Sequence, residues 1–152
     1  TMKFTTPAAM MLSGLFASLA LAHTDDVLDA QKSPDGGQMR MAGAYHYELV
    51  VAKSSKEVKE NPVVVYLTDH AGNKVQSAGA TGTATLLAGK LKASATLTPD
   101  GDNRLKGFAK YASEPDMKVV VSVTLPGKAA EQARFTPLLK KTDDAHSGQG
   151  KH

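Results

Sequence analysis

The chain has 152 residues and contains neither cysteine nor tryptophan. Without cysteine it folds without disulfides, and it has no thiolate to offer a metal ion. Its 18 basic and 15 acidic side chains are interspersed along the sequence. They form no basic stripe of the kind that binds nucleic acid and no basic amphipathic helix suited to a membrane surface. Among soft metal ligands, histidine and methionine remain.

The sequence also lacks the short motifs of common catalytic and nucleotide-binding sites. The stretch DGDNRLKG, residues 100 to 107, has Arg104 where a calcium loop needs an oxygen ligand, so it predicts a hairpin turn. TLLAGK, residues 85 to 90, lacks the first glycine of a phosphate-binding loop and the hydroxyl after Lys90. No HExxH motif, nucleophile elbow or framed pair of carboxylates is present. We therefore expect a protein that is not an enzyme.

The first 22 residues have the form of a secretory signal peptide. Met2 and Lys3 precede a short apolar run, and small residues stand at Ala20 and Ala22. The run is too short for a convincing membrane span. Cleavage after Ala22 would leave His23 as the amino terminus of an exported protein, which in a diderm bacterium is periplasmic.

The remainder divides into an arm, one domain and a tail. Residues 23 to 37 are polar and acidic without a sustained period, which predicts a flexible arm. Residues 38 to 138 are rich in β-forming residues and have the length of a single domain. Residues 139 to 152 are charged and then glycine-rich, and they include His146 and His152. This composition predicts a disordered, histidine-containing tail.

Short β-rich runs separated by turn residues fill the domain, and helical periodicity is weak throughout. The alternation in YHYELVVAK places Tyr45, Tyr47 and Leu49 on one face of a strand, with His46 and Glu48 on the other. Further strands are predicted at residues 63–69, 74–78, 83–89, 92–99, 104–111, 117–127 and 132–138. Seven or eight strands at this spacing predict an all-β fold, an immunoglobulin-like antiparallel β-sandwich.

Four segments carry a resemblance: GGQMRMAGAYHYELVV, VYLTDHAGNKVQSAGATGTATLL, LTPDGDNRLKG and KVVVSVTLPGKAAEQARF. Over residues 36 to 137 the chain resembles small exported bacterial proteins and domains associated with heavy-metal, chiefly copper, efflux systems. It is broadly similar to the periplasmic sandwiches that include YtkA-like and FixH-like domains. The resemblance implies a periplasmic metal-handling protein, and it implies no catalytic residues.

The candidate metal ligands begin with Met39, Met41 and His46. Thioethers and imidazoles are the ligands that Cu(I) prefers when no thiol is present. Met39 and Met41 are two residues apart and so share one face of an extended strand, about 7 Å apart. His46 would lie on the other face of an unbroken strand, but a bulge at Gly43 would bring it to the methionine face. The alternative is that both methionines fill gaps at the edge of a core and His46 is solvated.

Two more histidines are candidates at separate places. His70, in the turn sequence DHAGN, is either a ligand or an exposed turn residue. His23, as a free amino terminus, could chelate Cu(II) through its α-amine and ring nitrogen. The tail histidines could capture metal weakly or be incidental. Met117 opens a very apolar strand and is predicted to pack in the core.

These observations favour a periplasmic, non-catalytic protein that binds a metal ion, most simply copper, and buffers it or delivers it to an efflux system. The expected partner is a metal-efflux adaptor or another periplasmic protein. The competing interpretation is an interaction module without metal that docks an efflux adaptor or an envelope protein through its strand edges.

Overall fold

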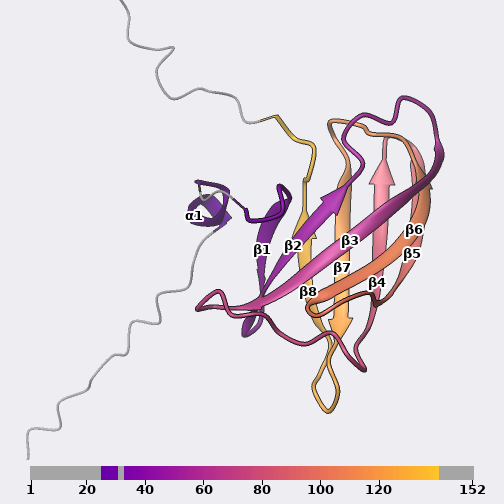
Figure 1. Cartoon of the computed structure of the whole chain (residues 1–152). Helices are drawn as coiled ribbons and strands as arrows, with labels where there is room; N and C mark the ends of the chain where they lie inside the picture. The colour runs from indigo at the N-terminus through magenta and orange to yellow at the C-terminus, as the bar shows by residue number, and fades with distance from the viewer. Residues whose placement is uncertain (1–24, 31–32, 141–152) are drawn as a thin grey trace, which may run out of the picture.

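The computed structural model describes residues 25–30 and 33–140, which form an all-β domain with one short helix (Figure 1). The helix α1 spans Asp25–Ala30. The strands are β1 (Gln38–Ala42), β2 (Tyr45–Val51), β3 (Lys59–Asp69), β4 (Thr81–Ala88), β5 (Leu91–Pro99), β6 (Arg104–Tyr111), β7 (Lys118–Thr124) and β8 (Glu131–Phe135).

All eight strands belong to one antiparallel sheet, in the order β1-β2-β3-β6-β5-β4-β7-β8. The predicted all-β class and strand number are confirmed, but the sheet is nearly closed on itself instead of forming two clearly separate layers. The reason lies in β5, which pairs with β4 up to Leu97 and with β6 at Thr98 and Pro99. The edge strands β1 and β8 approach each other near Gln38 and Thr136. The side-chain oxygen of Gln38 accepts a hydrogen bond from the Thr136 backbone N–H at 2.7 Å, and its NH₂ group donates to the Thr136 hydroxyl.

Two predicted features of the strands differ from the structure. Residues 38 to 51 form a hairpin, β1 and β2, joined by a turn at Gly43 and Ala44. The predicted strand at residues 74 to 78 is reduced to a single bridge between Thr68 and Lys74. Ser77, in the same segment, instead bonds the turn between β5 and β6: its hydroxyl donates to the Gly101 carbonyl at 2.6 Å.

The core fills the inside of the rolled sheet. Inward-facing residues alternate with outward-facing ones along each strand, as in β3, where Val63, Val65 and Leu67 are fully buried. Met117 is also fully buried, which confirms its predicted role in the core. Tyr111 is fully buried too, and its hydroxyl bonds the backbone N–H of Ala52 at 3.0 Å and the carbonyl of Pro62.

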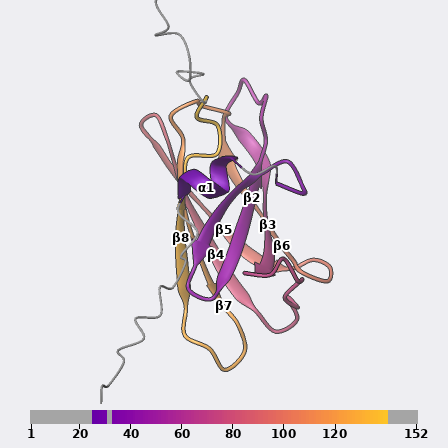
Figure 2. The same ribbon diagram turned by 90° about the vertical axis from the view of Figure 1, so that its left-hand side faces the viewer.

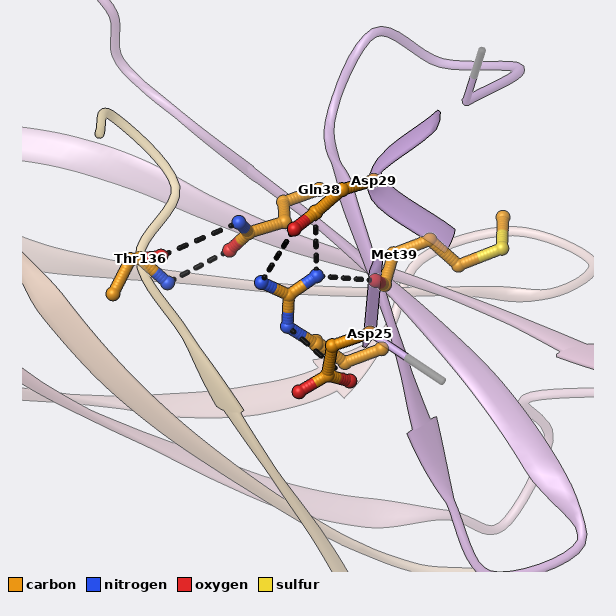
Figure 3. A network of polar contacts seen from close by, with 6 residues as sticks. Asp25, Asp29, Gln38, Met39 and Thr136 are labelled. Atoms are coloured by element: carbon orange, nitrogen blue, oxygen red, sulfur yellow. Dashed lines mark hydrogen bonds and ion pairs between the residues drawn. The ribbon is translucent and has the colours of Figure 1, made fainter. Parts of the chain in front are cut away.

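Part of the expected flexible arm is instead attached to the sheet. α1 lies against β1, near the edge where β1 and β8 approach each other (Figure 2). The buried Leu28 anchors it, and the Arg40 guanidinium donates to Asp29 at 2.7 Å and lies 3.6 Å from Asp25 (Figure 3). Among the residues that the structure describes, no helix has the length and apolar character that a membrane crossing requires.

Candidate functional site

The hairpin between β1 and β2 determines which side chains meet. Its two-residue turn sets Met41 directly opposite His46 and Met39 directly opposite Glu48. Directly opposed residues of an antiparallel pair project from the same face of the sheet. The predicted bulge at Gly43 is therefore wrong, because a turn, not an inserted residue, brings His46 to the methionine face. Gly43 has φ +57°, a left-handed conformation that glycine adopts without strain.

His70 joins this face from the turn between β3 and β4. The Asp69 carboxylate accepts hydrogen bonds from the backbone N–H groups of Ala71 and Asn73, both at 2.9 Å, and these bonds lower the pKa of Asp69. Gly72 has φ +85°, a left-handed conformation that glycine adopts without strain. In this turn His70 Nε2 lies 3.3 Å from the Gly43 carbonyl oxygen. The turn of the β1–β2 hairpin and the turn that follows β3 are thus in direct contact.

The His46 and His70 rings have centroids 4.8 Å apart and an interplanar angle of 31°. His46 is only 6% exposed although it faces outward, and the His70 ring is one of the groups that cover it. Met39 and Met41 are partly buried. We call Met39, Met41, His46 and His70 the Met/His corner. It contains four of the five predicted ligands. Its two imidazoles are in ring contact, and Met41 is in register with His46 across the hairpin.

Glu48 is a buried carboxylate beside this corner that the sequence did not single out. It is 3% exposed, and its Oε2 accepts hydrogen bonds from the backbone N–H groups of Gly37 (2.8 Å) and Asp35 (3.0 Å). Burial raises the pKa of the Glu48 carboxyl above its usual value, and the two backbone hydrogen bonds offset part of that rise. Glu48 and its cross-strand neighbour Met39 line an open cavity of about 300 Å³ with Lys74.

A pH dependence of stability follows from this burial. Because the folded-state pKa of Glu48 lies above its unfolded value of about 4.5, the folded state binds the proton more tightly. The carboxyl therefore costs stability progressively as the pH rises from that value through the folded-state pKa. Glu48→Gln keeps an oxygen for the two N–H donors and removes the charge. We expect its stability relative to wild type to increase over that window in urea unfolding experiments.

The exposed Glu60 provides the control for this experiment. Glu60→Gln makes the same chemical change on a solvated part of β3. Its stability relative to wild type should change little between pH about 4 and about 8. A pH-independent difference between Glu48→Gln and wild type would contradict the assigned cost of burying this carboxylate.

The other predicted ligand, His23, lies outside the described residues, as do His146 and His152. Within residues 25–30 and 33–140, no three His, Cys, Asp or Glu side chains are grouped to hold a metal ion. The Met/His corner differs from such groups because it combines two imidazoles with thioethers. Figure 3 shows the Met39 side chain extending away from the polar network of Asp25, Asp29, Gln38 and Thr136.

Comparisons of the chain with protein-family models, with curated proteins and with solved structures found no match. The resemblance to exported copper-handling proteins therefore remains a prediction. What bears on function is the geometry of the Met/His corner.

Proposed function

We propose that this protein binds Cu(I) at the Met/His corner and acts in the periplasm as a non-catalytic copper buffer or carrier. The observation that carries the proposal is the contact between the His46 and His70 rings, whose centroids are 4.8 Å apart, beside Met41, which is in register with His46. Two imidazoles and a thioether match the ligand preference of Cu(I). Met39, on the same face two residues away, would supply a second thioether.

The surroundings of the corner support exchange of the ion. His70 is exposed on its turn, whereas His46 is buried beneath it. An exposed outer ligand over a buried inner one would allow copper to enter and leave through the His70 side, by substitution of one ligand at a time. A partner such as an efflux adaptor would then accept the ion by offering a replacement ligand from outside.

The selectivity of the wild-type protein for metal ions tests this function. Under reducing conditions we expect one Cu(I) per chain to be taken from a chromophoric Cu(I) chelator, and Zn(II) to bind much more weakly, because thioethers contribute little to zinc binding. Failure to compete for Cu(I) would overturn the proposal. The interaction-module interpretation would then be preferred, because it requires no metal.

A further inference from the structure

The two ends of the rolled sheet differ in charge and in apolar exposure. β2, β4, β6 and β8 run toward one end, where β3, β5 and β7 begin. We call this the lysine end; it comprises the loop 52–58, the hairpin 87–92, the loop 112–117 and the segment 136–140. The 52–58 loop and the 136–140 segment lie at the top of Figure 1. The Met/His corner is at the opposite end, on the turns after β1 and β3.

Within the described residues, the exposed large apolar side chains gather in the half of the molecule nearer the lysine end. Four of them are at that end itself, and Phe108 lies on β6 three residues before the strand finishes. The four are on three separate segments of the chain: Val58, Leu87, Leu91 and Leu139. Exposed apolar groups concentrated in this way mark a surface that contacts another phase or molecule.

The hairpin between β4 and β5 is the centre of this surface. Leu87 is 47% exposed and Leu91 is 37% exposed. Leu87 is in register with Lys92 on one side and Lys118 on the other, and Lys90 lies in the turn. Residues 87 to 92 include two lysines and no acidic residue. Leu87 is therefore flanked on both sides by ammonium groups, whereas Leu91 is in register with the buried Ala88 and projects from the other face of the hairpin.

The adjoining segments carry both signs of charge. Lys53, Lys56, Lys59 and Lys140 are balanced by Glu57, Glu60, Glu114 and Asp116, so the excess of lysine is at the β4–β5 hairpin and its neighbour Lys118. The loop is held in place, because the Ser55 N–H donates to Ser113 Oγ at 2.8 Å and the Ser113 N–H donates to the Ser55 carbonyl at 2.7 Å. These two bonds fix the 52–58 loop, which carries Val58, against the loop 112–117.

We propose that the lysine end docks onto an anionic lipid bilayer, with Leu87 and Leu91 entering the interface and the flanking lysines contacting lipid phosphates. Apolar side chains inserted to the headgroup level and lysines held near anionic lipid act together in peripheral membrane binding. Long lysine side chains can bury their methylenes and keep their ammonium groups at the phosphates. This inference does not depend on copper; it would place the Met/His corner at the end facing away from the membrane.

Co-sedimentation with lipid vesicles tests the proposal. The chain without residues 1 to 22 should be used, because the apolar leader would partition into lipid by itself. We expect binding to phosphatidylglycerol vesicles and not to phosphatidylcholine vesicles, with loss of binding at high salt. Leu87→Ser/Leu91→Ser and Lys90→Glu/Lys92→Glu should each weaken binding at least about tenfold. Lys74→Glu/Lys128→Glu, at the opposite end, should leave it unchanged.

A second readout uses the absence of tryptophan. Leu91→Trp introduces a single fluorophore whose emission should shift to the blue with phosphatidylglycerol vesicles, whereas Ala129→Trp, on the exposed turn after β7, should show no shift. No binding to anionic vesicles, or equal loss in the Lys74→Glu/Lys128→Glu variant, would overturn the proposal. So would a dimer detected by sedimentation velocity that Leu87→Ser/Leu91→Ser dissociates while vesicles have no effect.

Discussion

Gly107→Ala is expected to lower the free energy of unfolding by about 3 kcal/mol, which is a large share of the roughly 5–15 kcal/mol typical of a domain. A Cβ at this position of β6 would overlap the Thr96 carbonyl oxygen and approach the Thr96 carbonyl carbon to 3.0 Å. Both atoms belong to the backbone of β5 and cannot move without shifting that strand. The shift would disturb the β5–β6 junction that makes the sheet continuous.

Gly89→Ala is the matched control for this substitution. Gly89 has φ +60°, so alanine would be strained there, but no atom lies within 4 Å of the added methyl group. The expected cost is about 1 kcal/mol, from backbone conformation alone. Urea unfolding of the two variants should therefore distinguish the free-energy cost of the close contact with β5 at Gly107 from the cost of a strained backbone conformation at Gly89. Equal losses, or a larger loss for Gly89→Ala, would contradict the close approach of β5 and β6.

The strand content could be predicted because inward positions alternate with polar ones. Ala84 and Leu86 of β4, which the core buries, alternate with threonines at positions 83 and 85. The closure of the sheet could not be predicted, since it depends on β5 pairing with two neighbours over different parts of its length. Local alternation is the same whether such a strand belongs to a sandwich or to a rolled sheet.

The candidate site was predictable in its residue types but not in its geometry. At Gly43 the sequence was interpreted as an unbroken strand or a bulge, whereas the cross-strand register shows a turn. The contact between His46 and His70 joins β2 to the turn that follows its neighbour β3, and it depends on the register of those two strands, which no local pattern reveals. The lysine end was hidden for the same reason: its lysines are dispersed along the sequence, and antiparallel topology alone gathers them.

A second large effect is expected from removing the sulfur atoms of the corner. Met39→Leu/Met41→Leu keeps the apolar volume and removes both thioethers. We expect the Cu(I) affinity to fall about 100-fold, equivalent to about 3 kcal/mol of binding free energy. Met41→Leu alone should account for most of the loss, because Met41 is opposite His46 whereas Met39 is opposite Glu48. Thermal stability should change little, since both methionines are only partly buried.

Competition with a chromophoric Cu(I) chelator, under reducing conditions, tests the central claim most directly. Wild type, Met39→Leu/Met41→Leu and the control Met117→Leu would be titrated side by side. Met117 is fully buried in the core, away from the corner, so its replacement removes one sulfur without touching the proposed ligands. The account predicts that the double variant loses most of its Cu(I) affinity and that Met117→Leu retains the wild-type value. Wild-type affinity in the double variant, or an equal loss in Met117→Leu, would contradict it.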